Sequence, residues 1–341
     1  NEGLTVIHIR DRATSLSPTE EQQLIAANWN GPTNPDKRIQ LAAARIEERA
    51  TRPSPMLAPS AAVTGLNPAP LAGKTLSIQY RLPPQAGPDD IAVVIGTGDY
   101  TRLGRDIPDV TPAHADADAF IRYAREGLGV RPGNIISMRD ATQAQLFRVF
   151  GSGDNPQGQL HDWIQPGRSH VYVYFAGHGA PMANGKGSYL VPADADSARL
   201  ELNGYPLDTL YANLARLPAA SVTVVLEACF SGQSQAGAVI KRASPLFVRP
   251  LPDAVPKGIT VIAASGMDQI ASWEPDGSHG LFTKYFLLAM SGEADLAPYG
   301  DGNGRVADQE LETYLHDTLT YWARRYYSRD QVARIVHGDR S

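Results

Sequence analysis

The chain contains two apolar runs that end in similar ways, VYVYFAGHG at residues 171–179 and VTVVLEACFSG at residues 222–232. Each begins with a short, Val-rich stretch, which is typical of a strand buried on both faces of a parallel sheet. Each then continues through small residues to a reactive side chain, His178 in the first and Cys229 in the second. Ligand sites of such sheets lie beyond the carboxyl ends of the strands. If the two strands are neighbours, the imidazole and the thiol reach the same edge of the sheet.

Further short apolar runs along the chain predict four more strands, separated by segments with helical patterns. Strands that alternate with helices indicate an α/β fold with a mostly parallel six-stranded sheet sandwiched by helices. The additional strands are expected at Ile91–Ile95, Ile135–Met138, Ile259–Ala263 and Arg334–His337, and the helices at Asp116–Glu126, Gln143–Phe150, Leu281–Met290 and Asp308–Arg325.

The beginning of the chain has a different character. Leu4–Arg10 and Thr75–Arg81 alternate apolar and polar residues, which predicts two half-buried strands, and residues 51–73 are rich in Pro, Ala and Ser, as in a connector. We therefore predict an N-terminal extension or prosegment at residues 1–85 and one main domain at residues 86–341.

Composition excludes several classes of protein. Hydrophobic residues make up 43% of the 341 residues and charged residues 20%, which is ordinary for a folded domain. The net charge of −5 argues against nucleic-acid binding, because phosphate contacts need a basic surface. No apolar run approaches the ~20 residues that a membrane-spanning helix needs. We expect a soluble protein, cytoplasmic or exported, of undetermined oligomeric state.

Cys229 is the single cysteine, so no disulfide can form within the chain. A thiol attacks a carbonyl well only when a base removes its proton, and an imidazole can do this and later protonate the leaving amine. The reaction also needs backbone N–H donors for the developing oxyanion. Gly177 and Gly179 flank His178 and allow the backbone to approach a substrate closely.

The blocks around His178 and Cys229 resemble the His-Gly and Cys blocks of the caspase, metacaspase and legumain clan of cysteine peptidases. Their separation of 51 residues is near the ~50 residues that is typical of caspases. The likeness covers about residues 89–339 and is greatest to bacterial caspase homologues related to metacaspases, although Glu227-Ala228-Cys229 follows the legumain pattern. The resemblance implies a caspase-like fold and an endopeptidase with a Cys229/His178 dyad that acts on proteins or peptides. It also implies an oxyanion hole made by the backbone amides of Gly179 and Cys229.

Acidic side chains near the predicted cleft suggest a substrate preference. An acidic wall in the pocket for the residue before the scissile bond favours Arg or Lys there. Glu227 is the leading candidate for this wall, followed by Asp268, Glu274 and Asp109. Because the Glu-Ala-Cys block matches legumains, an Asn-directed pocket is the alternative.

The segment 234–258 separates the Cys block from the next predicted strand. It contains basic residues among small residues and prolines, which predicts an exposed loop open to cleavage. Some members of the resembling clan cut themselves in this region. The candidate positions for self-processing here are Arg242, Arg249 and Lys257.

A turn near the end of the chain resembles half of a calcium loop. With Gly304 at its sixth position, Asp301, Asn303 and Glu310 fall at liganding positions three, five and twelve. Tyr299 occupies the first position and ligates poorly, so a turn before a helix is favoured, and no metal or cofactor is expected. His279 is interpreted as a packing or surface histidine.

Two other classes of function compete with the peptidase. The first is a caspase-like scaffold without activity that binds other proteins. The second is a doubly wound hydrolase or nucleotide-binding protein, suggested by Gly96-Thr97-Gly98 after the first strand. That motif lacks a third glycine at the required spacing and a following Gly-Lys-Ser/Thr.

Overall fold

The computed structural model describes residues 76–338, apart from 104–105, 184–186, 232, 236, 240–254 and 267–268. The predicted strand at Leu4–Arg10 and the connector at 51–73 lie outside the described residues, and the division of the chain at residue 85 stays a prediction. Within the described part, no helix combines the length and apolar character needed to cross a bilayer.

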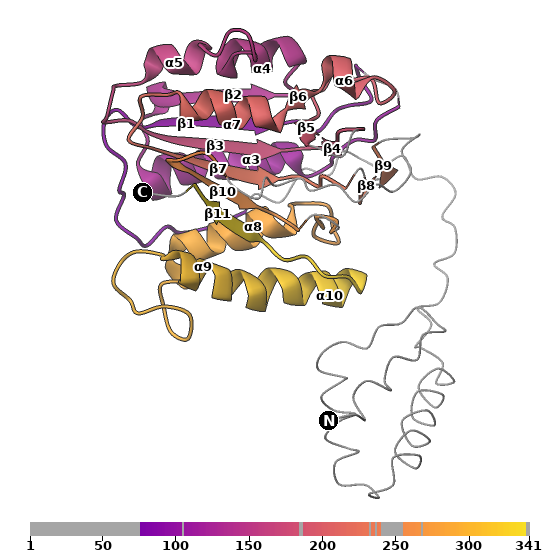
Figure 1. Cartoon of the computed structure of the whole chain (residues 1–341). Helices are drawn as coiled ribbons and strands as arrows, with labels where there is room; N and C mark the ends of the chain where they lie inside the picture. Colours follow the sequence, from indigo (N-terminus) through magenta and orange to yellow (C-terminus); the bar gives the residue numbers. More distant parts are fainter. Residues whose placement is uncertain are drawn as a thin grey trace, which may run out of the picture. The chain divides into compact units, whose positions relative to one another are not determined.

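A six-stranded sheet forms the centre of the described domain (Figure 1). Its order is β11-β10-β7-β3-β1-β2, and every neighbouring pair is parallel except β10 and β11. The predicted α/β fold with a mostly parallel six-stranded sheet is confirmed. The strands are β1 (Ile91–Gly96), β2 (Ile135–Arg139), β3 (His170–Ala176), β7 (Ser221–Glu227), β10 (Ile259–Ala263) and β11 (Arg334–His337).

Helices cover both faces of this sheet (Figure 1). One face carries α3 (Ala113–Arg122), α8 (Leu281–Leu288), α9 (Asp308–Leu315) and α10 (Tyr321–Tyr327). The other face carries α4 (Gln143–Phe150), α5 (Gln159–Trp163) and α7 (Leu207–Ala215), and a short helix, α6 (Leu200–Asn203), precedes α7. Wider π-type turns at Tyr123–Leu128 and Ala289–Glu293 extend α3 and α8, and one at His316–Thr320 joins α9 to α10.

The central strands are apolar throughout because both of their faces are buried. Successive side chains of a strand point to opposite faces, so Ala92 and Val94 of β1 pack under α3 and α8 while Val93 and Ile95 pack under α4 and α7. Leu226 at the end of β7 is fully buried. Truncating such a side chain to alanine costs about 2–5 kcal/mol, so these strands form a rigid base for the loops beyond them.

Two small sheets follow the carboxyl ends of the central strands. β4 (Gly179–Pro181), β5 (Ser188–Leu190) and β6 (Tyr205–Pro206) form an antiparallel sheet directly after β3. β8 (Gln233–Ser234) and β9 (Gly237–Ala238) form a hairpin shortly after β7. Neither these short strands nor α7 was predicted. Strands of two or three residues carry no measurable alternation.

The predicted strand at Thr75–Arg81 is wrong for residues 76–81, which form no strand and pair with no described strand. Their alternation is real, since Ile78 is buried while its two neighbours are exposed. The segment packs on helices instead of a sheet edge. The carbonyl of Leu76 accepts a hydrogen bond from Arg122 of α3, and Arg81 N–H donates to the carbonyl of Ser291 (3.0 Å).

Candidate active site

The register of the sheet brings His178 and Cys229 to the same height. Ala176, the last residue of β3, pairs with Glu227, the last residue of β7. His178 and Cys229 each lie two residues beyond these partners, and both line one small cavity with about 20 Å³ of space for water. Both residues therefore lie at the same edge of the sheet, as the sequence predicts for neighbouring strands. Both side chains are buried, with exposures of 2% for His178 and 6% for Cys229.

Gly179 lets the two loops approach each other. A Cβ at this position would overlap the Phe230 ring and lie 2.8 Å from the carbonyl oxygen of Cys229. Gly179 stands opposite Leu190 in β5, while Val191 N–H donates to the carbonyl of His178 (3.0 Å). In an antiparallel ladder this makes Gly179 a non-hydrogen-bonded position, so its N–H points away from β5 and is not used by that strand.

Backbone and side-chain contacts both fix His178. Its Nε2 lies 2.7 Å from the carbonyl oxygen of Pro108. A carbonyl only accepts hydrogen bonds, so Nε2 carries the proton and Nδ1 is left as the basic nitrogen. Tyr100 bridges the loop, because its hydroxyl accepts from His178 N–H (2.9 Å) and donates to the carbonyl of Val191 (3.0 Å). Burial lowers the pKa of His178 to about 4, against an opposing effect of the Pro108 carbonyl and of Asp109.

Cys229 is a protonated thiol in this arrangement. Burial raises its pKa to about 12, Glu227 adds to the rise, and the N–H of Ala271 and the charge of Arg329 oppose it. Sγ lies 2.7 Å from the Ala271 nitrogen, which donates to it. With His178 neutral as well, the resting site holds a thiol and an imidazole rather than a thiolate and an imidazolium.

Glu227 is an acidic residue that lines the cavity. Its Oε2 accepts hydrogen bonds from the backbone N–H (2.7 Å) and the hydroxyl (2.9 Å) of Thr283 on α8, whereas Oε1 is buried and accepts none. Burial, reinforced by the nearby charge of Asp116, raises the pKa of Glu227 to about 8. Glu227, which has one carboxyl oxygen without a hydrogen-bond partner, thus lines the same cavity as Cys229.

Asp116 is a second acid at this cavity and was not among the predicted site residues. It comes from α3, is fully buried, and lines the cavity with Glu227. Asp116 accepts from His279 Nδ1 (2.8 Å) and from Gly280 N–H (2.9 Å). Burial raises its pKa, although its contacts with His279 and Gly280 act in the other direction. His279 is therefore a buried partner of this acid rather than a surface residue.

A comparison with known protein families matches residues 89–301 to the model described as the caspase domain. This match covers more than half of the chain. The chain belongs to the caspase-domain family. A solved structure, the crystal structure of caspase-1 from Spodoptera frugiperda, is similar over 78% of this chain and 93% of that one, at 12% identity and a TM-score of 0.48. A search of curated proteins finds no match. The family supports a hydrolase of the cysteine peptidase type that acts on protein substrates.

Two of the other predicted specificity residues, Glu274 and Asp109, do not line the cavity of this caspase domain. Glu274 is half-buried and pairs with Lys284 (2.6 Å). Asp109 binds the backbone N–H (2.8 Å) and hydroxyl (2.9 Å) of Thr101, and its charge acts on His178 from the side of Pro108. Asp268 lies outside the described residues.

The predicted processing positions fall in two places. Arg242 and Arg249 lie outside the described residues. Lys257 is exposed, two residues before the amino end of β10. Its neighbour Gly258 is held by Val222 N–H at the start of β7 (3.1 Å). Since β7 and β10 are parallel, Lys257 lies at the end of the sheet opposite to Cys229.

The β8–β9 hairpin closes one side of the cavity. Gln235 at its tip lines the cavity together with Cys229 and Glu227. Its Oε1 accepts from Trp273 N–H (2.9 Å) and Arg329 (3.2 Å), and its Nε2 donates to the Tyr327 hydroxyl (3.0 Å). Three hydrogen bonds thus hold the Gln235 side chain at the cavity.

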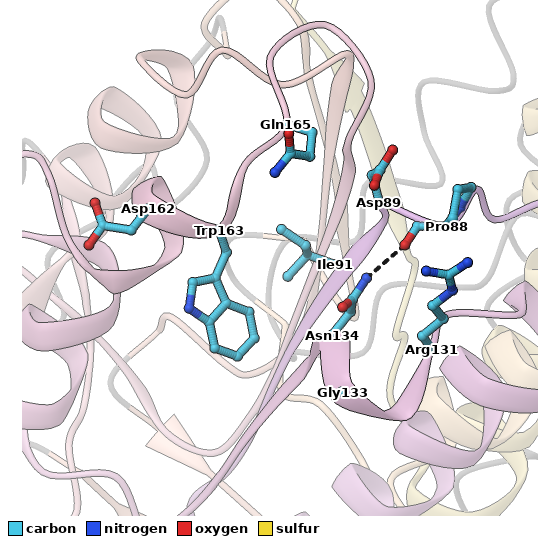
Figure 2. Close-up of a pocket in the computed structure, with 9 residues that line it drawn as sticks. All are labelled: Pro88, Asp89, Ile91, Arg131, Gly133, Asn134, Asp162, Trp163 and Gln165. Carbon is cyan, nitrogen blue, oxygen red and sulfur yellow. Dashed lines mark hydrogen bonds between the residues drawn. The ribbon is translucent and has the colours of Figure 1, made fainter.

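The remaining predicted residues and a larger cavity lie elsewhere. Asp301, Asn303 and Glu310 surround the loop before α9 and do not line the cavity of Cys229. A cavity of about 400 Å³ lies between Ile91, Asn134 and Trp163 (Figure 2). Ile91 begins β1 and Asn134 directly precedes β2, so this cavity lies at the amino ends of the strands, away from the dyad.

Proposed function

We propose that this protein is a cysteine endopeptidase in which Cys229 is the nucleophile and His178 the general base and acid. The observation that carries the proposal is the Ala176–Glu227 register pair, which sets both side chains at one cavity beyond the carboxyl ends of β3 and β7. A buried structural cysteine needs no imidazole at the same height and no second loop approaching its carbonyl through a glycine.

The tautomer of His178 suits the reaction. With Nε2–H donating to Pro108, Nδ1 can take the proton of the Cys229 thiol as sulfur attacks the peptide carbonyl. The C–N bond then breaks and the imidazolium gives its proton to the leaving amine. Water, deprotonated by the same imidazole, hydrolyses the thioester, releases the carboxylic acid and restores the thiol. The N–H groups of Gly179 and Cys229 are the proposed donors to the oxyanion.

Asp116 and Glu227 are the proposed walls of the pocket for the residue before the scissile bond. The two acids line the same cavity as Cys229, and Oε1 of Glu227 has no hydrogen-bond donor. An entering guanidinium or ammonium would supply that donor and draw both carboxyls into their charged forms. This chemistry favours cleavage after Arg or Lys over cleavage after Asn, whose neutral amide offers no charge to the pair.

The resting enzyme is proposed to be closed. Cys229 and His178 are both neutral, and Gln235 is fastened at the cavity by Trp273, Arg329 and Tyr327. Release of the hairpin would hydrate the site and lower the pKa of the thiol. Cleavage after Arg242 or Arg249, in the segment that follows the hairpin, is the proposed trigger. Lys257 is a poorer candidate because it lies at the opposite end of the sheet.

A fluorogenic peptide series that differs only in the residue before the scissile bond tests the peptidase. We expect the order Arg, then Lys, well above Asn and Asp, with all activity absent in Cys229→Ala. A preference for Asn would replace the Arg/Lys assignment with the legumain-like alternative. No turnover of any peptide by the processed chain, with the fold intact, would favour the inactive scaffold.

Mass spectrometry tests self-processing separately. When wild-type protein is incubated alone, the signal of the uncleaved chain should decrease and fragments that end at Arg242 or Arg249 should appear. Cys229→Ala should stay intact, and an Arg242→Gln, Arg249→Gln double variant should stay intact while still cleaving peptides after limited external proteolysis. Equal intact masses of wild type and Cys229→Ala after prolonged incubation would contradict self-processing.

A further inference from the structure

Three carboxylates that the proposed reaction does not use converge between α8 and α9. One oxygen from each of Asp295, Asp301 and Glu310 lies within 4.8 Å of the other two. Asp295 and Glu310 are buried and Asp301 is exposed at the rim. Within the described part of the chain, none of the three forms an ion pair with Lys, Arg or His. Like charges this close repel one another unless something neutralises them.

Asp295 has one buried carboxylate oxygen that lacks a hydrogen-bond donor. The residue is only 4% exposed, and its Oδ2 accepts from Gly304 N–H (3.1 Å). Its Oδ1 is buried with no hydrogen-bond partner. A buried carboxylate oxygen without a donor has lost its hydration and gained nothing in return, which is costly. A bound cation would satisfy this oxygen and neutralise the group at once.

The loop around these acids has its shape set by its own side chains. Oδ1 of Asp301 accepts from Asn303 N–H (3.1 Å), and Oδ1 of Asn303 accepts from Arg305 N–H (3.0 Å). Glu310, in the first turn of α9, closes the loop: its Oε1 accepts from Asp301 N–H (3.1 Å) and its Oε2 from Ala307 N–H (2.8 Å). Each of these oxygens has a second lone pair that can face inward.

We propose that this loop binds one Ca²⁺ ion, with Asp295, Asp301 and Glu310 as carboxylate ligands and the side-chain carbonyl of Asn303 beside them. Hard oxygen donors without His or Cys suit Ca²⁺, and oxygens held 2.3–2.6 Å from one ion lie up to about 5 Å apart. The sequence spacing argued against calcium because Tyr299 stands at the first liganding position. In the structure Asp295, four residues earlier, supplies a buried carboxylate in its place.

Calorimetric titration of the full, chelator-treated chain with CaCl₂ tests the site without relying on peptidase activity. We expect one ion per chain, much weaker binding of MgCl₂, and a higher thermal midpoint with calcium. Asp295→Asn and Glu310→Gln should each weaken binding at least about tenfold, because ligand charge sets affinity in such sites. Glu312→Gln, an exposed acid on the same helix and outside the cluster, should bind as wild type does.

Asp301→Asn provides a second variant at an exposed position in case changes at the buried Asp295 disturb folding, which circular dichroism would reveal. Loss of calcium binding in a folded Asp301→Asn protein supports the site. The proposal is overturned if the wild-type chain binds no calcium up to about 10⁻³ M, the weak end for protein sites. It is also overturned if folded Asp301→Asn and Glu310→Gln bind with wild-type affinity, which would place the ion elsewhere.

Discussion

His178 and Cys229 stand at equal distances beyond a pair of residues that the sheet holds in register. Ala176 and Glu227 are register partners at the ends of the parallel strands β3 and β7, and His178 and Cys229 each follow their strand by two residues. The rigid sheet, rather than the loops, therefore sets the relative height of sulfur and imidazole. If the two groups act as a unit, removing either should cost nearly the whole of the catalysis.

His178→Ala and Cys229→Ala should each lower kcat/KM for an Arg peptide by about 10³-fold or more, and the double variant should be no worse than either single one. Non-additivity is expected because neither group acts without the other. Initial rates with one fluorogenic peptide measure this, and His316→Ala, an exposed histidine, is the matched control. Additive losses, or a His178→Ala protein with near-normal rates, would contradict the dyad.

The pattern of the sequence predicted this pair but not the acid beside it. Val-rich runs that end in small residues mark buried strands, and the carboxyl-end rule then places His178 and Cys229 together. Asp116 comes from a helix far earlier in the chain, and only the packing of α3 brings it to Glu227. A signal was present, since Asp116 lies four residues before Phe120 on the buried face of that helix.

Gln235 could not have been predicted as part of the site for a different reason. Its hairpin strands are two residues long, and its hydrogen-bond partners come from segments about 40 to 90 residues away in sequence. Such polar contacts leave no periodic trace. The sequence also could not show that Glu274 pairs with Lys284 on the next helix, because that ion pair depends on the folded geometry.

Alkylation of Cys229 should report the closed state directly, because this is the only cysteine in the chain. Burial raises the thiol pKa to about 12, and only the thiolate reacts. Below that pKa the thiolate fraction grows tenfold per pH unit, so the rate with iodoacetamide should be slow at about pH 7 and keep rising beyond about pH 9, where an ordinary exposed thiol levels off. Intact-mass spectrometry follows the reaction.

Gln235→Ala should speed this alkylation at every pH, because the variant removes the three hydrogen bonds that hold the hairpin at the cavity. Gln309→Ala, an exposed glutamine on α9, is the control and should leave the rate unchanged. A wild-type rate that already levels off near about pH 8 would mean that the thiol is exposed in solution, contrary to a closed resting site.

Glu227→Gln should flatten the dependence of stability on pH. Burial and the charge of Asp116 raise the pKa of Glu227 from 4.5 to about 8. Between these values the unfolded chain releases a proton that the folded chain keeps. The free energy of unfolding of the wild type therefore falls as pH rises through this window, by an amount on the order of a few kcal/mol. The contribution is fully present below about pH 4.5 and lost above about pH 8.

Urea unfolding of wild type and Glu227→Gln at about pH 5 and about pH 8 measures the difference. At the higher pH, the free energy of unfolding of Glu227→Gln should rise relative to that of the wild type. Glu312→Gln, which changes an exposed acid, should show no such rise. The same Glu227→Gln protein should cleave Arg peptides about 30-fold or more slowly in kcat/KM, as expected when one partner of a buried charge pair is truncated. Equal pH profiles in the two proteins would show that Glu227 is charged throughout.

Tyr100→Phe tests whether the backbone around His178 needs its phenol bridge. The Tyr100 hydroxyl is the link between His178 N–H and the carbonyl of Val191, so the variant leaves a buried donor and a buried acceptor unpaired. We expect a loss of about 1–3 kcal/mol in the free energy of unfolding. Because the loop that carries the imidazole would loosen while Asp116 and Glu227 stay in place, kcat should fall more than KM rises. Tyr321→Phe, which removes an exposed hydroxyl, should change neither quantity. If Tyr100→Phe lowered stability but left kcat intact, the bridge would serve only the pairing of the segments before β4 and after β5, and not the position of the His178 side chain.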